Sequence, residues 1–499
     1  MYPLDGRLPQ QVSEENAELV LHVLDEAGVP YTLVRTATHT RTTIAVSVRQ
    51  RSRVLQALQS DIQDEAVYVA TFLEYDGPTV DAVIATPTEP LARERRPLRA
   101  YDPDQFNAAL IRVWKFYLDE PSGFVLGHSH ACEIEFWQER SLAKAKWRAP
   151  RANVAGDTFS DQDVTLAPRS RQSRLSSVFD LRMIDDIDFP IDVVYTWVDS
   201  SDPAWREKFQ RFSGRVTKEE FHEEASVDQR FRSRDELRYS LRSLSMYAPW
   251  VRHVYIVTDG QVPEFIDFSK EDITLVDHRE ISRTPDALPV FNSSAIISWL
   301  HRIPSLSEHY IYMNDDVFMG RDVAPSAFFT PSGLAKVFPS NNRRPFGEPT
   351  PKGEPHINIT RNIRALLEQE FGRSISRSVK HTPHAQLVSV QYELEKRFPD
   401  AYERTSRSRF RHHLDVAADQ LFHYYAQITG HAIVGSIRYA YVNIGDRRNE
   451  SELKRVLETR SREVFCLNDV PTDRAEGMSD QTVRGFLEAY FPVKSRWEI

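Results

Sequence analysis

Two adjacent aspartates, Asp315 and Asp316, end a short apolar run in the segment HYIYMNDDVFMG, residues 309–320. Neighbouring carboxylates repel each other, and burying either one is costly unless a cation lies between them. Mg²⁺ or Mn²⁺ would stabilise the pair, because these ions take oxygen ligands and commonly hold substrate phosphates as well. The adjacent aspartates at the end of an apolar run therefore indicate a metal site that binds a diphosphate. The alternative is that one aspartate caps a turn while the other is solvated.

More acidic residues follow the neighbouring apolar runs. In a sheet of parallel strands, ligands bind beyond the carboxyl ends of the strands. Four consecutive strands, each followed by polar groups, would therefore bring these groups to one edge of the sheet. The residues are Asp199 and Asp202 after the first strand, Asp259 after the second, Asp277 and His278 after the third, and Asn314 with the aspartate pair after the fourth.

Basic residues that could neutralise a diphosphate occur in two clusters. The segment QRFRSRDELR supplies Arg230, Arg232 and Arg234 just before a predicted helix, whose first backbone N–H groups also favour anions. The segment RSRFRHHLD supplies Arg411. Arginine forms paired hydrogen bonds with phosphate oxygens, so both clusters are candidate phosphate-binding groups. The alternative for each cluster is a solvated basic turn.

One histidine is a candidate general base. In HTPHAQLVSVQYELEKRF, Thr382 suits the N-cap of a helix, Pro383 its first position and His384 its first turn. The positive end of the helix would favour the neutral imidazole that a general base needs. The alternative is a histidine that makes a structural hydrogen bond only.

The elements that must position these residues indicate an α/β domain over residues 188–499. Near-continuous apolar strands that alternate with helices are typical of a mostly parallel sheet covered on both faces. Strands are predicted at 191–199, 252–260, 273–278 and 309–314, and helices at 233–250 and 293–303.

The first 150 residues indicate a smaller α+β domain. Helices are predicted at 15–28, 53–61 and 104–120, and strands at 31–35, 42–48, 66–74 and 79–86. Residues 151–187 are polar and irregular, which predicts a linker. The expected organisation is an accessory domain at 1–150, a linker, and a catalytic domain at 188–499.

The bulk properties exclude several classes of protein. A net charge of −9 argues against non-specific nucleic-acid binding, which needs a basic surface. Only two cysteines occur, which fits a reducing compartment. No signal peptide is recognisable, and no run approaches the roughly 18 apolar residues that span a bilayer. We expect a cytoplasmic protein without a transmembrane segment. No phosphate-binding loop, dinucleotide fingerprint or serine-hydrolase motif is present in the sequence.

Four segments, in order, resemble the conserved blocks of the Stealth family. They are IDVVYTWVDSSDP, the stretch from RFRSRDELRYSL to HYIYMNDDVF, the stretch from HTPHAQLVSV to ADQLFHYY, and FCLND, and they span about residues 190–470. Stealth proteins include bacterial capsule polymerases and the animal GlcNAc-1-phosphotransferase. The resemblance implies a Rossmann-like, GT-A-like catalytic domain.

The resemblance also implies a reaction. A hexose-1-phosphate, by default GlcNAc-1-phosphate, would pass from a UDP-sugar to a sugar hydroxyl of a glycan acceptor, in capsule or cell-surface polysaccharide synthesis. A phosphodiester would form and UMP would leave. Mg²⁺ or Mn²⁺ and the arginines would neutralise the diphosphate and the charge on the leaving phosphate. Such an enzyme could be loosely held at the inner membrane face and could form a homodimer.

Matching the blocks residue by residue assigns roles. Asp315, Asp316 and Asp469 would contact the metal or the diphosphate, and Asp316 would also be catalytic. His384 would be the general base, with Asp199 as a competing candidate, and Arg411 would clamp a phosphate. The predicted substrate-binding residues are Arg230, Arg232, Arg234, Asp202, Asn292 and Asn314.

Departures from the family pattern leave the sugar open. Ser200 stands where members commonly have glycine, and Ser294 and Ile297 stand where the usual pattern has histidine and glutamate. Two other functions remain as alternatives. One is a conventional metal-dependent glycosyltransferase that releases UDP, and the other is a catalytically silent module that binds a glycan or nucleotide.

Overall fold

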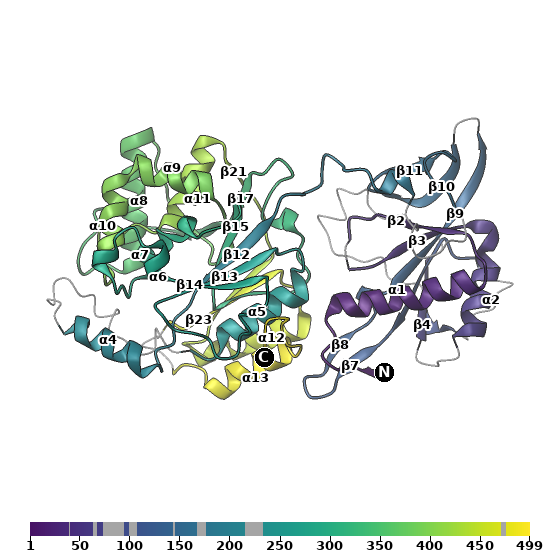
Figure 1. The fold of residues 1–499 in the computed structure, drawn as a ribbon, viewed down its shortest axis with the longest axis horizontal. Coiled ribbons are helices and arrows are strands. Elements are labelled where there is room, and N and C mark those ends of the chain that lie inside the picture. The colour runs from purple at the N-terminus through teal and green to yellow at the C-terminus, as the bar shows by residue number, and fades with distance from the viewer. Residues whose placement is uncertain are drawn as a thin grey trace. The chain divides into compact units, whose positions relative to one another are not determined.

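The computed structural model describes residues 1–38, 40–62, 67–72, 94–98, 107–142, 145–166, 176–214, 233–470 and 476–499. The chain divides into two compact units, Met1–Ile184 and Asp185–Ile499 (Figure 1). The predicted linker therefore belongs largely to the first unit. Its residues include the end of strand β10 (Ala145–Asn153) and strand β11 (Gly156–Phe159).

The first unit is an α+β domain, as predicted. Its main sheet has the order β11-β10-β9-β6-β4-β5, and β3 joins β2 to β9. Helices α1 (Pro9–Glu26) and α2 (Arg51–Asp61) share one apolar core with this sheet, in which Leu24, Leu58 and Ile134 are fully buried. The other strands are β1 (Tyr2–Pro3), β2 (Tyr31–Val34), β3 (Thr43–Ser47), β4 (Val67–Phe72), β5 (Glu94–Pro97), β6 (Leu110–Lys115), β7 (Tyr117–Asp119), β8 (Phe124–Leu126) and β9 (Cys132–Leu142).

The helix predicted at 104–120 is wrong, because the described part of this segment forms strands β6 and β7. The sequence LIRVWK of β6 is rich in β-branched and aromatic residues, which fit a pleated surface buried on both sides. β6 pairs with β4 on one side and β9 on the other, and this pairing outweighs the helical spacing of the apolar residues. The strand predicted at 79–86 lies outside the described residues.

The second unit confirms the predicted α/β fold class. Its central sheet has the order β14-β13-β12-β15-β20, with β12, β13, β14 and β15 parallel and β20 antiparallel. Residues on both faces of β12 and β15, such as Val193, Val194 and Ile311, are fully buried. The strands are β12 (Ile191–Thr196), β13 (His253–Thr258), β14 (Ile273–Asp277), β15 (His309–Asn314) and β20 (His384–Leu387).

Strand order gives this sheet a topological switch point. β12 lies between β13 and β15. The chain runs from β12 to β13 and β14 on one side, and then crosses back to form β15 on the other side of β12. Crevices at such switch points, beyond the carboxyl ends of the strands, are where open α/β sheets bind ligands. The register pairs Thr196 of β12 with Asn314 of β15 at this edge. Asp199 and the aspartate pair follow directly in the chain.

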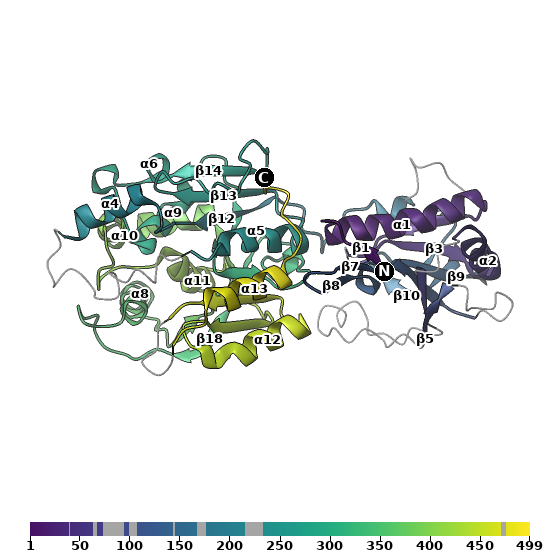
Figure 2. The same ribbon diagram turned by 90° about the horizontal axis from the view of Figure 1, so that it is seen from below.

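A second small sheet joins the end of the chain to this edge. It has the order β16-β23-β22, formed by β16 (Val317–Met319), β23 (Val464–Asn468) and β22 (Tyr439–Asn443). Helices α12 (Glu450–Thr459) and α13 (Asp480–Tyr490) lie side by side (Figure 2). β16 begins immediately after Asp316, so the fourth block of the sequence is paired next to the aspartates.

The remaining elements complete the second unit. Helix α9 contacts both α10 and α11, β17 pairs with β21, and β18 pairs with β19. Within the described residues, no helix is both long and apolar enough to cross a membrane. The bounds are α4 (Pro203–Ser213), α5 (Glu236–Tyr247), α6 (His278–Ile281), α7 (Ser293–Ile297), β17 (Ala335–Val337), β18 (Pro339–Arg343), α8 (Pro355–Phe371), β19 (Arg377–Val379), α9 (Val388–Arg397), α10 (Pro399–Arg407), α11 (Ala418–Thr429) and β21 (Ala432–Val434).

Candidate active site

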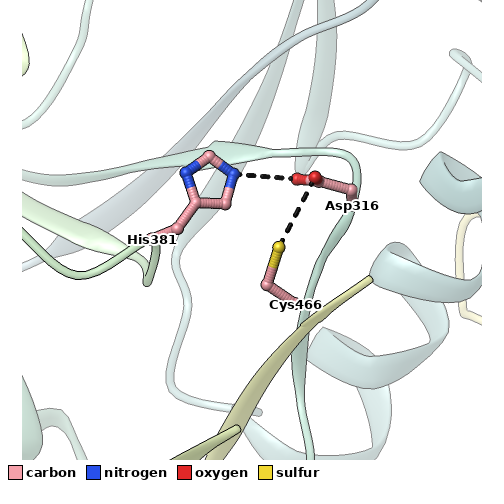
Figure 3. A group of neighbouring side chains, drawn as sticks. All are labelled: Asp316, His381 and Cys466. Carbon is pink, nitrogen blue, oxygen red and sulfur yellow. Dashed lines mark hydrogen bonds and ion pairs between the residues drawn. The ribbon is translucent and has the colours of Figure 1, made fainter. Parts of the chain in front are cut away.

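Asp316 lies at the centre of a polar cluster built by three distant segments. Its Oδ1 atom is 3.2 Å from Nε2 of His381. Its Oδ2 atom accepts hydrogen bonds from Nδ2 of Asn468 at 3.3 Å and from the thiol of Cys466 at 3.5 Å (Figure 3). The antiparallel pairing of Val317 with Cys466 fixes this approach. Residues from the second, third and fourth sequence blocks therefore meet at one carboxylate.

Asp315 and Glu236 add two further carboxyl groups to this cluster. Burial raises the pKa of Asp315 well above its usual range, and the charges of Glu236 and Asp316 raise it further. Burial also raises the pKa of Glu236, at the start of α5, and Asp316 adds to that shift. Three neighbouring carboxyl groups fit the oxygen ligands of Mg²⁺ or Mn²⁺, because a divalent cation would stabilise their charged forms against burial and against one another.

Arg234 binds acids of the protein in this structure. Its Nη2 atom donates to Oδ2 of Asp469 and its Nε atom to Oδ1 of Asp480, both at 2.8 Å. Glu236 lies 3.7 Å from the same guanidinium and accepts a hydrogen bond from the Arg234 backbone N–H. The Arg234 side chain is buried. It therefore joins the predicted ligand Asp469 to the acid cluster. Arg230 and Arg232 lie outside the described residues.

His384 does not begin a helix, so that prediction is wrong. It opens strand β20, pairs in register with Tyr312 of β15, and helix α9 begins only at Val388. Backbone pairing to the edge of the central sheet outweighs the capping signal of Thr382, whose hydroxyl has no hydrogen-bond partner among the described residues. The pairing places His384 beside β15, three residues after His381, which contacts Asp316.

The His384 ring lies between two hydrogen-bond acceptors. Its Nδ1 atom is 2.8 Å from Oδ2 of buried Asp419, and its Nε2 atom is 3.0 Å from the carbonyl oxygen of Lys380. Burial raises the pKa of Asp419, but the hydrogen bond and charge of His384 lower it by more, so the net pKa lies below its usual range. A buried carboxylate that binds Nδ1 fixes the orientation of the imidazole, as an Asp–His catalytic pair requires.

His381 is the histidine closest to the aspartates. Burial lowers its pKa, but the negative charge and hydrogen bond of Asp316 outweigh burial, so the net pKa is raised. Nε2 of His381 is also 3.1 Å from Nδ2 of Asn314, and Oδ1 of Asn314 accepts from the Tyr312 hydroxyl at 2.5 Å. The predicted substrate-binding residue Asn314 is thus part of the cluster.

Asp199 and Asp202 lie in a turn after β12. Both carboxylate oxygens of Asp199 accept from Ser201, one from its backbone N–H and one from its hydroxyl, at 2.8 Å. Asp202 caps helix α4 through the backbone N–H of Ala204 and also accepts from Nε2 of Gln261 at 2.9 Å. These contacts shape the turn, and no hydrogen bond or ion pair connects either aspartate to Asp316 among the described residues.

Asn292 and Arg411 lie where the second and third blocks meet. Asn292 is fully buried, and its Nδ2 atom donates to Oδ2 of Asp415 at 2.8 Å and to the carbonyl oxygen of Ser408 at 3.1 Å. Arg411 reaches the hydroxyl of Ser293 at 3.4 Å. Asn292 therefore holds the segment that carries Arg411.

Five residues of the site were not identified from the sequence: Glu236, His381, Asp419, Cys466 and Asn468. Each lies inside one of the four segments that resemble Stealth blocks. Its position in that segment fits the ordinary pattern of a helix or strand and does not mark it as functional. Cys466 is apolar-like within a buried strand, and Asp419 is in the first turn of α11, where acids are common caps. Only long-range pairing of β16 with β23 and of β15 with β20 brings these residues together.

Asp415 gives this region a predicted pH dependence. Burial raises its pKa to about 6, although hydrogen bonds from the His412 backbone N–H and from Asn292 oppose the shift. An unfolded aspartate has a pKa of about 3.9. Because the folded protein holds this proton to higher pH than the unfolded chain, Asp415 lowers stability as the pH rises from about 4 to about 6.

Asp415→Asn should therefore raise the free energy of unfolding by roughly 2 kcal/mol at neutral pH and by much less near pH 4. The amide keeps an oxygen for both donors, and its NH₂ replaces Oδ1, which has no hydrogen-bond partner among the described residues. Urea denaturation at both pH values measures the difference. Exposed Asp185→Asn is the control, and an equal change at both pH values would contradict this account of Asp415.

Comparison with known proteins gives the same four blocks. Stealth protein conserved region 1 matches residues 189–217, region 2 residues 230–337, region 3 residues 380–427 and region 4 residues 454–499. The predicted resemblance is confirmed. The cluster around Asp316 contains at least one residue from each of conserved regions 2, 3 and 4.

Whole-chain relatives extend the similarity to the first unit. Exopolysaccharide phosphotransferase SCO6023 of Streptomyces coelicolor is 38% identical over 506 residues, covering 98% of this chain and 83% of that protein. Exopolysaccharide phosphotransferase CpsY of Mycobacterium leprae is 32% identical, covering 98% and 87%. A crystal structure of the galactosyltransferase LgtC covers 60% of this chain and 94% of its own at 9% identity, with a TM-score of 0.30, too low to bear on function. With four conserved regions in order and relatives similar over almost its entire length, the chain belongs to the Stealth family.

Proposed function

We propose that this protein transfers a hexose-1-phosphate from a UDP-sugar to a hydroxyl of a glycan acceptor in exopolysaccharide synthesis, with GlcNAc-1-phosphate as the first candidate group. A phosphodiester forms and UMP is released. The observation that carries the proposal is the convergence of three conserved regions on Asp316, beside the switch point of the sheet. Its relatives carry the name exopolysaccharide phosphotransferase, which supports the same reaction class.

The acid cluster supports the metal assignment. Mg²⁺ or Mn²⁺ would be held by Asp315 and Asp316, with Glu236 and Asp469 nearby, and would supply positive charge for the diphosphate. Asp469 is already bound to Arg234, so this arginine balances charge on the protein side of the site. Arg411 remains the proposed phosphate clamp.

The His384–Asp419 pair supports the proton transfer. The acceptor hydroxyl must lose its proton as the phosphodiester forms, and an imidazole oriented by a buried carboxylate suits that role. To act as the base, Nε2 of His384 would have to turn away from the Lys380 carbonyl oxygen, give up the proton directed at it, and meet the acceptor hydroxyl with a free lone pair. Asp199 is the competing candidate, and both of its oxygens are already engaged by Ser201.

The test identifies the nucleotide product. Purified protein is incubated with Mg²⁺ or Mn²⁺, a panel of UDP-sugars beginning with UDP-GlcNAc, and simple glycan acceptors, and the nucleotides are separated by chromatography. UMP that depends on both metal and acceptor is expected. UDP in its place would assign the protein to the conventional glycosyltransferases. Donor binding by calorimetry without any product would assign it to the silent modules.

His384→Gln should lower the rate of transfer by about 10²–10⁴-fold with little change in donor affinity. Glutamine fills similar space and can hydrogen-bond to Asp419, but it cannot take a proton at neutral pH. Turnover and donor binding are measured in parallel. His253→Gln, at the opposite end of the parallel sheet, is the matched control. Near-full turnover of His384→Gln would remove the base role from His384 and favour Asp199.

A further inference from the structure

Asp316, His381 and Cys466 offer three chemically different ligand atoms to one point. One atom from each side chain, a carboxylate oxygen, an imidazole nitrogen or a thiol sulfur, lies within 4.8 Å of the other two. Figure 3 shows the imidazole and the thiol approaching the Asp316 carboxylate from different segments of the chain. Asp316 and His381 are partly buried, and Cys466 is fully buried. The donor set is mixed oxygen, nitrogen and sulfur.

The spacing of these atoms fits a tetrahedral transition-metal ion. Zinc binds cysteine sulfur at about 2.3 Å and imidazole nitrogen or carboxylate oxygen at about 2.0–2.2 Å, so its ligand atoms lie roughly 3.3–3.7 Å apart. Nε2 of His381 is 3.2 Å from Oδ1 of Asp316, and Sγ of Cys466 is 3.5 Å from Oδ2. These two distances run to different oxygens of Asp316, and all three ligand atoms lie within 4.8 Å of one another, so side-chain rotation would have to bring them around one ion.

The surrounding contacts hold the ligands in place. Register pairing fixes Cys466 opposite Val317, and the Leu467 backbone N–H donates to the Asp316 carbonyl oxygen at 3.0 Å. Nδ2 of Asn468 binds Oδ2 of Asp316 and would hold the carboxylate while Oδ1 turns to a metal. Such supporting hydrogen bonds orient metal ligands and increase affinity.

Ligand type decides which ion this set prefers. Thiolate and imidazole select Zn²⁺ and related transition metals, whereas Mg²⁺ takes oxygen ligands almost exclusively. We propose that Asp316, His381 and Cys466 form a binding site for a divalent transition-metal ion that takes Zn²⁺ in preference to Mg²⁺. The three side chains leave a fourth position for water or a substrate oxygen, as in catalytic zinc sites. Binding displaces two protons, one from the Cys466 thiol and one from Nε2 of His381, which faces the Asp316 carboxylate in this structure, and no electron is transferred.

This inference does not depend on the proposed transfer reaction, but the two share Asp316. An ion bound by the thiol and imidazole would occupy the carboxylate on which the Mg²⁺ or Mn²⁺ site is built. Zn²⁺ is therefore expected to compete with Mg²⁺ and not to add to it.

Cobalt substitution tests the site by a spectroscopic signal. Metal-free full-length protein is titrated with Co²⁺, which takes tetrahedral sites and gives a sulfur-to-metal charge-transfer band only when a thiolate is a ligand. We expect one equivalent to produce this band, Zn²⁺ to abolish it stoichiometrically, and excess Mg²⁺ to leave it. Cys466→Ser should lose the band. Cys132→Ser should keep it, because Cys132 is the other buried cysteine and lies in the first unit.

A second variant distinguishes loss of a metal ligand from loss of folding. His381→Gln should weaken Co²⁺ binding by about ten-fold or more while near-ultraviolet circular dichroism stays that of the wild type. Absence of the charge-transfer band in folded wild-type protein would overturn the proposal. Retention of the band in Cys466→Ser, or its loss in Cys132→Ser, would do so as well. UMP release assayed in Mg²⁺ is a separate result, so failure of the metal site and failure of the transfer reaction are distinguishable.

Discussion

Asp316→Asn should reduce sugar-phosphate transfer by on the order of 10³-fold while leaving the fold intact. The substitution keeps the size and one hydrogen-bonding oxygen of the side chain but removes the charge that would hold a divalent cation. The amide can still contact Asn468 and His381, so the local pairing of β16 with β23 is expected to survive. Loss of this charge weakens the stabilisation of the diphosphate. Because the diphosphate is present only in the reacting complex, the loss should affect the rate and not the fold.

The measurement is the initial rate of UMP release at saturating donor and metal, with circular dichroism to confirm folding. Asp286→Asn is the matched control, because Asp286 is exposed and pairs with Arg407 at the surface. Raising the metal concentration should recover little of the rate, since the ligand itself is gone. A variant with wild-type turnover would exclude Asp316 from the metal and diphosphate site.

Glu133→Gln should lower the stability of the first unit by about 3–5 kcal/mol. Glu133 is buried in β9 and is shared by three arginines: Arg112 at 2.8 Å, Arg41 at 3.3 Å, and Arg151. Burial alone would raise its pKa, but the three guanidinium groups lower it far below its usual range. Removing the charge takes away the carboxylate that the three guanidinium groups share, although Arg151 keeps its ion pair with Glu135.

Hydrogen exchange of peptides from each unit resolves this effect within the whole chain. Peptides from β9 and β6 should exchange faster in Glu133→Gln, and peptides from the central sheet of the second unit should not change. Because the folded pKa of Glu133 is depressed, its stabilising effect is present at neutral pH and is lost as the pH falls below about 4. Exposed Glu120→Gln is the control, and equal exchange in the two variants would show that the network contributes nothing.

The parallel core of the second unit was predictable because each of its strands is a nearly continuous run of apolar residues in the sequence. IDVVYT, HVYIVT and HYIYMN all formed strands, and the acids after them do lie at the carboxyl ends. The helix over LRYSLRSL was likewise evident from its 3.6-residue spacing. Local periodicity is sufficient for such elements, since burial on one or two faces dictates residue type.

Residues whose surroundings come from distant segments were harder to predict. His384 has a helix-start sequence, yet pairing to β15 makes it a strand residue. The segment LIRVWK has apolar residues at helical spacing, yet β4 and β9 enclose it. Cys466 has the character of a core residue, and only its register opposite Val317 turns its thiol toward Asp316. Local sequence carries no direct signal for any of these pairings.

The pairing of β16 with β23 also sets when a newly synthesised chain can become active. Val317 leaves the ribosome long before Cys466, although the two residues are partners in the same small sheet. Until β23 has emerged, the central sheet can form, but Asp316 lacks the thiol, the Asn468 amide and the Asp469–Arg234 ion pair. Synthesis of β23 is therefore required before the cluster around Asp316 can assemble.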